Sequence, residues 1–226
     1  MKMTRLKTIG LALCAGLMLT SCGSDKSASA LDVIKNLPAS IKSRRATPKP
    51  ISAAEIAQAL QATNKPVALF QVENRKNAQV LLSEVERNGA YQTFGNQSRQ
   101  AVVLRDGMIT ASRGLGGDLM SVEEDELLDM IQSRGSGNVS YVQRFLTPEY
   151  KTKVIIYYCS VRPGAGNHTP LGRASIPTSS VGVSCKATGE ASFENSYYLA
   201  GDGTIVSGRQ WMGETIGYVD TQLLRY

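Results

Sequence analysis

Hydrophobic and polar residues recur with two different periods along the chain, and the change of period marks the predicted elements. A capping-box sequence, Ser52-Ala-Ala-Glu55, precedes apolar residues at helical spacing, which predicts a helix that ends near Asn64. The pattern then favours strands over residues 67–72, 79–86, 91–94, 101–105 and 108–112. The run over 79–86 also fits a helix, but Asn88-Gly89 after it is a hairpin signal and favours a strand. Asp106-Gly107 predicts a second tight turn.

A glycine-rich block and a second helix signal follow these strands. The block Arg113-Gly-Leu-Gly-Gly-Asp118 has neither the Lys-Ser/Thr pair of a P-loop nor the full dinucleotide fingerprint. We therefore interpret its glycines as backbone positions of positive φ, where a strand leaves its sheet. Ser121-Val-Glu-Glu124 predicts a capping box that opens a helix over residues 122–132, with Gly135 just past its end.

The chain after residue 138 carries almost only strand signals, separated by glycine turns. Strands are predicted over residues 139–146, 150–161, 181–187, 191–199, 204–211 and 217–224. Residues 162–178 are rich in Gly and Pro and are predicted to form a long loop. Regular strand spacing is typical of antiparallel sheets. The predicted fold class is therefore mainly β with a few short helices, the antiparallel sheet being curled into a barrel- or half-barrel-like body.

The N-terminal residues have the pattern of an export signal. Basic residues at positions 2, 5 and 7 precede an apolar run over residues 9–19, which is too short for a membrane span of about 20 residues. The run ends in Leu19-Thr20-Ser21-Cys22, which resembles the bacterial lipobox, whose cysteine is acylated and becomes the new N-terminus. The alternative is an ordinary signal peptide with an incidental cysteine, cut after Ala28-Ser29-Ala30.

Three regions follow from this interpretation. They are a lipoprotein signal peptide over residues 1–21, a lipidated N-terminus and flexible tether over 22–50, and a single β-rich periplasmic domain over 51–226. No apolar run after Cys22 is long enough to span a bilayer, so we expect only the lipid on Cys22 to enter the membrane. Several acyl chains, palmitate among them, would anchor the protein nearly irreversibly, because each buried methylene contributes about 0.8 kcal/mol.

The charge balance gives no reason to expect a nucleic-acid partner. The whole chain has 25 basic and 19 acidic residues, but three of the basic ones lie in the leader. The mature chain therefore carries a net charge of only +3, from 22 basic and 19 acidic residues. Its basic residues are also not interleaved with aromatic residues in a recognisable binding motif.

The four cysteines fit an exported protein. Cys14 is lost with the leader and Cys22 is lipidated, which leaves Cys159 and Cys185 as an even pair in an oxidising compartment. We predict a disulfide between them, the alternative being two buried free thiols. No metal or other cofactor is expected, because the only histidine, His168, lies in a Gly/Pro-rich stretch with no carboxylate nearby in sequence.

The candidate chemistry points to binding more than to catalysis. With one histidine in the chain, no convincing Ser–His or Cys–His pair exists. A paired-carboxylate glycoside hydrolase remains a rival, from Asp118, Glu194, Asp202 and Glu214. Aromatic residues gather late in the sequence, where their ring faces could stack on sugars while Arg209 and Gln210 donate hydrogen bonds to hydroxyls. The alternative is that these rings pack the core of the sheet.

Three blocks together carry a family resemblance. They are Val103-Leu-Arg-Asp-Gly-Met-Ile-Thr-Ala-Ser-Arg-Gly-Leu-Gly-Gly-Asp-Leu119, then Cys185 followed by Phe193-Glu-Asn-Ser-Tyr-Tyr198, then Gly203-Thr-Ile-Val-Ser-Gly-Arg-Gln-Trp211 with Ile216-Gly-Tyr-Val219. Their order and spacing behind a lipobox resemble the YjbF/GfcB-type lipoproteins of exopolysaccharide and group 4 capsule gene clusters. The resemblance covers roughly residues 50–226.

The resemblance implies an outer-membrane lipoprotein that supports secretion or assembly of a surface polysaccharide, with no enzymatic activity. The residue after the cysteine is Gly23 and not aspartate. In enteric bacteria, a residue other than aspartate at this position directs a lipoprotein to the outer membrane. Expected partners are the membrane through the lipid anchor, and either the polysaccharide or polysaccharide-export proteins. The candidate glycan or partner contacts are Arg113, Asp118, Tyr198, Arg209, Gln210 and Trp211. The rivals are a polysaccharide-trimming hydrolase and a purely structural envelope lipoprotein.

Overall fold

The computed structural model of the chain describes residues 48–147, 149, 151–172 and 174–226. The predicted signal peptide, the predicted lipidation site Cys22 and nearly all of the predicted tether lie outside the described residues. The elements in chain order are α2 (Ala53–Ala62), β1 (Val67–Val72), the 3₁₀ helix η1 (Glu73–Arg75), β2 (Ala78–Asn88), β3 (Tyr91–Gly95), β4 (Ala101–Arg105), β5 (Met108–Arg113), β6 (Leu119–Glu123), α3 (Asp125–Gln132), β7 (Gly137–Leu146), β8 (Thr152–Leu171), β9 (Ala174–Lys186), β10 (Phe193–Leu199), β11 (Ile205–Trp211) and β12 (Tyr218–Arg225).

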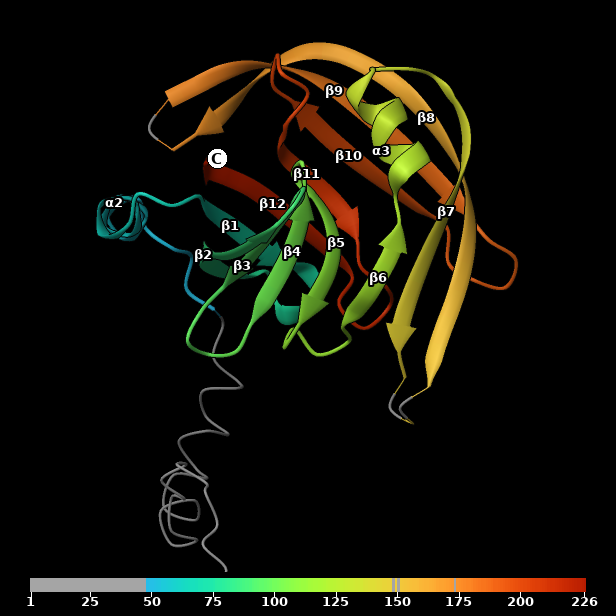
Figure 1. The fold of residues 1–226 in the computed structure, drawn as a ribbon, viewed down its shortest axis with the longest axis horizontal. Helices are drawn as coiled ribbons and strands as arrows, with labels where there is room; N and C mark the ends of the chain where they lie inside the picture. The colour runs from blue at the N-terminus through green and yellow to red at the C-terminus, as the bar shows by residue number, and fades with distance from the viewer. Residues whose placement is uncertain (1–47, 148, 150, 173) are drawn as a thin grey trace, which may run out of the picture. The chain divides into compact units, whose positions relative to one another are not determined.

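The strands form one antiparallel sheet that is nearly closed into a barrel (Figure 1). The strand order is β5-β4-β3-β2-β1-β12-β11-β10-β9-β8-β7-β6. Most sheet neighbours are also chain neighbours, as short hairpin connections require. The exception is β1, the first strand of the chain, which pairs with β12, the last. The predicted fold class is confirmed.

The edge strands β5 and β6 meet at a seam that side chains bridge. The Leu119 N–H donates to the Ser112 hydroxyl at 3.1 Å, and the Arg113 guanidinium donates to the Leu119 carbonyl at 3.2 Å. From across the interior, the Gln210 side chain accepts from the Ile109 N–H at 3.0 Å and donates to the Ile109 carbonyl at 2.7 Å. Part of the seam therefore depends on side-chain hydrogen bonds, in contrast to the backbone ladders elsewhere.

Local sequence explains the first helix and the tight turns. Ser52 and Glu55 form both hydrogen bonds of the predicted capping box at the start of α2. The predicted turn Asp106-Gly107 connects β4 and β5, with φ of 48° and 88°. A Cβ atom on Gly107 would lie 1.9 Å from the Ile205 carbonyl oxygen, so this turn needs glycine for both its φ and its space.

The second predicted helix was wrong in its first turn. Ser121, predicted as the helix cap, lies in β6 and pairs with Arg144 of β7. Helix α3 begins only at Asp125, and its N-cap residue Glu124 makes no side-chain cap. The Glu124 carboxylate instead accepts hydrogen bonds from Tyr91 at 2.8 Å and Arg105 at 3.0 Å. Pairing in the sheet therefore outweighed a local capping preference.

The predicted long loop over residues 162–178 was also wrong. Strands β8 and β9 continue through it as one long hairpin, paired from Tyr158↔Lys186 to Leu171↔Ala174. Pro163 and Pro170 lie past the last pair of β8 with β7, and Pro177 lies past the last pair of β9 with β10. Proline lacks an N–H and is tolerated where one side of a strand has no partner, so it did not end these strands.

Two clusters of buried residues fill the body, and we call them the N-terminal and C-terminal cores. The N-terminal core lies under β1–β5 and β12 and is built from residues such as Phe70, Phe94 and Leu104. The C-terminal core lies under β7–β11 and α3, and it contains Tyr141, Tyr157 and the Cys159–Cys185 disulfide. The predicted disulfide is therefore present, between directly paired residues of β8 and β9. Among the described residues, no helix is long and apolar enough to cross a membrane.

Candidate functional site

Two of the predicted contact residues hold the seam loop together. The Asp118 carboxylate accepts hydrogen bonds from the Gly114 N–H at 2.9 Å and the Leu115 N–H at 3.1 Å. The Arg113 guanidinium donates to the carbonyls of Ser112 and Leu119. These contacts give the glycine-rich block a structural role in the loop between β5 and β6. Neither residue lines either of the two hollows described below.

Three more predicted contacts are engaged with the fold or lie apart from the hollows. Gln210 is buried and holds the β5 backbone, as described above. Arg209 forms ion pairs with Asp220 at 3.0 Å and Glu73 at 2.7 Å, and lies 4.3 Å from the centre of the Tyr218 ring. Tyr198 is half-buried on β10 and pairs with Ser180 of β9 and Ser207 of β11.

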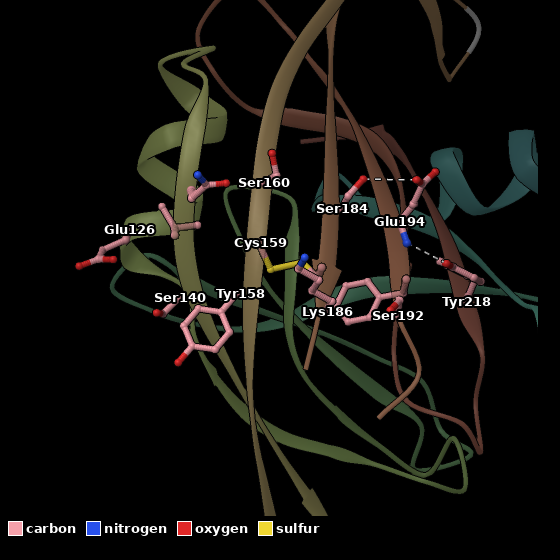
Figure 2. A pocket seen from close by; sticks show the side chains of 14 residues that line it. Glu126, Ser140, Tyr158, Cys159, Ser160, Ser184, Lys186, Ser192, Glu194 and Tyr218 are labelled. Atoms are coloured by element: carbon pink, nitrogen blue, oxygen red, sulfur yellow. Dashed lines mark hydrogen bonds between the residues drawn. A yellow bond between two sulfur atoms is a disulfide. The ribbon is translucent and has the colours of Figure 1, made fainter. Parts of the chain in front are cut away.

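An open hollow of about 1010 Å³ lies on the exposed face of β7–β10, and we call it the outer hollow. Figure 2 shows its side chains, with Tyr158 and Lys186 on either side of the disulfide and Ser184 pointing toward Glu194. The Ser184 hydroxyl donates to the Glu194 carboxylate at 3.3 Å. The hollow is lined by Glu126, Asn138, Val139, Ser140, Tyr158, Cys159, Ser160, Ser184, Cys185, Lys186, Ser192, Phe193, Glu194 and Tyr218.

The outer hollow presents an aromatic ring beside many hydrogen-bonding groups. Tyr158 is 67% exposed, the largest value among the exposed large hydrophobic residues. Its cross-strand neighbours are Ser140 on β7 and Lys186 on β9. Four serine hydroxyls, the Asn138 amide, a lysine and carboxylates surround it, so donors and acceptors are both present. An exposed ring among such groups suits a ligand with apolar faces and many hydroxyls.

A smaller pocket of about 180 Å³ lies at one end of the sheet, where several turns meet, and we call it the end pocket. It contains Trp211, the one predicted contact residue that lines any of these hollows. Lys153 and Glu190 form an ion pair at 2.8 Å beside it. The pocket is lined by Gly117, Phe145, Leu146, Thr147, Lys153, Ile155, Tyr157, Glu190, Ala191, Trp211, Met212, Gly213, Glu214 and Thr215.

Glycines allow the turns around the end pocket to approach closely. Gly213 has a φ of 87°, and a Cβ atom there would lie 2.9 Å from the Phe145 ring. Gly117 has a φ of 136°, and a Cβ atom there would lie 2.6 Å from Thr215. Burial raises the pKa of the Tyr157 hydroxyl to about 12, and the Glu190 and Glu214 carboxylates add to the effect. The neutral form of Tyr157 therefore persists to a higher pH than that of an ordinary tyrosine.

A series of aromatic contacts joins the two hollows, and we call it the aromatic ladder. Tyr157 meets Phe193 edge-on at 4.8 Å, Phe193 stacks on Trp211 at 6.1 Å, and Trp211 meets Tyr218 edge-on at 5.2 Å. Tyr157 and Trp211 line the end pocket, whereas Phe193 and Tyr218 line the outer hollow. Tyr157 and Phe193 are buried in the C-terminal core, and Trp211 and Tyr218 pack against it partly buried, so these four rings follow the core-packing alternative.

The four carboxylates of the rival hydrolase prediction do not meet in one hollow. Glu194 lines the outer hollow and Glu214 lines the end pocket. Asp118 is bonded to its own loop, and the Asp202 carboxylate accepts from the Thr204 N–H at 2.9 Å in the β10–β11 turn. The retaining and inverting geometries both require two such groups on either side of one bond.

Sequence reasoning counted Tyr158 among the late aromatic residues without choosing it as a contact, and it missed Ser184 and Lys186. Strand β8 carries apolar residues on both faces, since Val154, Ile156 and Tyr158 are exposed while the residues between them are buried. Alternation within β8 therefore could not show which face is solvated. The usable signal lay in the neighbouring strands, where serines and Lys186 occupy the matching positions.

Comparisons with known proteins connect this chain to capsule lipoproteins. A sequence profile of the family described as group 4 capsule polysaccharide lipoprotein gfcB, YjbF, matches residues 41–224. The chain resembles the solved structure of the hypothetical lipoprotein YmcC from Escherichia coli K12, with a TM-score of 0.66 and 11% identity over 89% of this chain and 98% of that one. This likeness shows a shared fold.

A second solved structure is an exported protein with a YmcC-like fold from Bacteroides fragilis. It matches with a TM-score of 0.31 and 8% identity, over 71% of this chain and 93% of that one. No curated protein sequence matches the chain.

Proposed function

This chain belongs to the group 4 capsule polysaccharide lipoprotein (YjbF) family, and we propose that it supports secretion or assembly of an exopolysaccharide or capsule by binding glycan in the outer hollow. The observation that carries the proposal is the 67% exposed Tyr158 ring among serine, lysine and carboxylate groups. Sugar rings have apolar C–H faces and hydroxyl edges, which match an aromatic ring bordered by donors and acceptors.

The size of the outer hollow supports a polymeric ligand. Its volume of about 1010 Å³ is at the upper end of the roughly 300–1,000 Å³ found for ligand sites. It is open to solvent and crosses several strands, so a chain could lie across it and leave at both ends. In this proposal the protein binds without turnover, which is supported by the separation of Asp118, Glu194 and Asp202 described above.

The proposal also includes the location of the protein. Lipid on Cys22 anchors it in the outer membrane, and the β-rich body faces the periplasm. Gly23 at the position after the cysteine supports this destination, since aspartate there is the signal for retention in enteric bacteria. Replacing Cys22 with serine should leave the chain unprocessed or absent from outer-membrane fractions. Normal processing and full complementation of a deletion by this variant would contradict the anchor.

The direct test uses the full lipoprotein and polysaccharide purified from the producing strain. We expect the wild-type protein to bind the polymer and Tyr158→Ala to bind about tenfold more weakly, which corresponds to about 1.4 kcal/mol. Tyr226→Ala is the matched control, because Tyr226 is also an exposed tyrosine, at 45%, but does not line the hollow. Polymer binding that Tyr158→Ala leaves intact would contradict the assigned site.

The same samples separate the rival functions. Release of new reducing ends from the polymer would indicate the hydrolase. Absence of polymer binding, together with capture of polysaccharide-export proteins by the wild type and loss of that capture in Tyr158→Ala, would assign the hollow to a protein partner. The apolar residues Val154 and Ile156 beside Tyr158, both about half exposed at 52% and 53%, give that outcome a physical basis. Unchanged surface polysaccharide in a deletion strain would favour a purely structural lipoprotein.

A further inference from the structure

The end pocket is built around a tryptophan whose backbone is held on both sides. The Trp211 N–H donates to the Asn195 side-chain oxygen at 2.8 Å, and the Gln143 amide donates to the Trp211 carbonyl at 3.3 Å. Asn195 and Gln143 are both buried. Stacking on Phe193 and the edge contact with Tyr218 then limit the rotation of the indole side chain. The ring is thus positioned before any ligand arrives, which lowers the entropic cost of binding.

Polar groups beside the indole can reach a ligand in the pocket. The Lys153–Glu190 ion pair joins β8 to the β9–β10 turn. Glu214 is exposed in the β11–β12 turn and lines the same pocket. Its charge also acts on the buried Tyr157 hydroxyl. The pocket therefore offers an aromatic wall together with carboxylate acceptors and an ammonium donor.

The size and charge of the pocket restrict what it can hold. Its volume of about 180 Å³ is well below the roughly 300–1,000 Å³ of sites for larger ligands, so it has room for one ring and not for a chain. Two carboxylates and one ammonium give it a net charge of −1, which disfavours anions. We propose that the end pocket is a second binding site, which takes a single neutral pyranose residue against Trp211.

This site is separate from the one in the proposed function and does not depend on it. The outer hollow is a surface across which a polymer can lie, whereas the end pocket accepts one residue, such as a side branch or a chain end. The aromatic ladder connects the two, because Trp211 contacts both Phe193 and Tyr218. Because Tyr158 lines only the outer hollow and Glu214 only the end pocket, loss of polymer binding and loss of single-sugar binding can still be measured independently.

Tryptophan fluorescence provides the test, because Trp211 is the only tryptophan in the chain. The full lipoprotein would be titrated with glucose, galactose, N-acetylglucosamine and glucuronate. We expect at least one neutral sugar to change the emission saturably, and glucuronate to bind at least fivefold more weakly. Glu214→Gln should weaken the neutral sugar severalfold and reduce the discrimination against glucuronate.

Two control variants make the result specific. Glu86→Gln removes an exposed carboxylate outside the pocket and should change nothing. Tyr158→Ala should leave single-sugar binding intact even where it abolishes polymer binding. The inference is overturned if no neutral sugar gives a saturable change. It is equally overturned if glucuronate binds as well as the neutral sugars, or if Tyr158→Ala, and not Glu214→Gln, removes the response.

Discussion

The two cores of this protein differ in what they bury. The N-terminal core is built from aliphatic and phenylalanine side chains, with Phe70 and Phe94 in edge contact at 6.3 Å. The C-terminal core buries the tyrosines Tyr141, Tyr157 and Tyr197 and a disulfide. Beside it lie the buried amides Gln143, Asn195 and Gln210. Both candidate binding sites lie over the C-terminal core and are lined by several of its members.

This difference indicates that the two cores under one sheet have different roles. An apolar core specifies packing but offers no groups that orient a polar ligand. Buried amides do so in the C-terminal core, because Asn195 and Gln143 hold the Trp211 backbone while Gln210 holds β5 at the seam. We therefore expect substitutions in the N-terminal core to change stability alone. Around the C-terminal core, we expect some substitutions to change stability and others to change binding.

The largest expected effect is on the N-terminal core. Phe70 is fully buried, so Phe70→Ala should lower the free energy of unfolding by about 3–5 kcal/mol through lost burial and a cavity. Urea unfolding measures the change. The surviving folded fraction should bind polymer with unaltered affinity. A loss below about 1 kcal/mol, or a specific loss of binding, would contradict the assignment of this core as a scaffold. The exposed Val85→Ala is the control.

The disulfide should contribute a slightly smaller amount to the C-terminal half. Cys159 and Cys185 are 26 positions apart, and closing such a loop in the unfolded chain is worth about 3.5 kcal/mol on the chain-entropy relation. Replacing both with serine should lower the free energy of unfolding accordingly. Hydrogen exchange should speed up in β8 and β9 and leave β1–β4 protected. Uniform loss of protection across both halves would show that the two cores are not distinguishable.

Alkaline pH should destabilise the C-terminal core specifically. The ordinary tyrosine pKa is near 10, whereas burial raises the pKa of Tyr157 to about 12. Between these values the unfolded chain ionises Tyr157 and the folded chain does not, so its contribution is complete below pH 10 and is lost as pH rises towards 12. Tyr157→Phe should reduce the fall in unfolding free energy between pH 9 and 11, and the exposed Tyr158→Phe should not. An equal fall in all three proteins would contradict the prediction.

The smallest expected stability effect is at the outer hollow. Tyr158 is mostly exposed and its side chain, unlike its backbone, makes no hydrogen bond within the described residues, so Tyr158→Ala should change the free energy of unfolding by less than about 0.5 kcal/mol. Its effect should be seen in polymer binding alone. A stability loss above about 1.5 kcal/mol, measured by urea unfolding, would mean that Tyr158 supports the fold. Weaker polymer binding by Tyr158→Ala would then not show that the ring contacts the polymer.

Short-range features were predictable because their physics is local. The hairpin at Gly89 and the turn at Gly107 need positive φ, which glycine adopts readily, and the capping box at Ser52 satisfies backbone groups three residues away. The mainly β class followed from strand spacing for the same reason. The pairing of Cys159 with Cys185 followed from their being the only two cysteines outside the predicted leader and the predicted lipidation site.

The failures arose where a distant strand supplied the deciding contact. Ser121 has a good local capping sequence, but it forms part of β6 and pairs with β7 instead of capping a helix. The stretch after Arg162, rich in glycine and proline, was predicted to be a loop, but each strand of the hairpin supplies the other with a partner. In both cases the competing interaction is long-range and has no signature within a local window of sequence.

The sequence by itself determined the turns, the fold class and the set of polar and aromatic residues available for binding. Only the tertiary structure decided which of them are free to bind. Gln210 and Trp211 are adjacent, yet one faces the interior and holds β5 while the other lines the end pocket. Tyr157 and Tyr158 divide in the same way across β8. Strand alternation sends neighbours to opposite faces, and the curl of the whole sheet decides which face is buried.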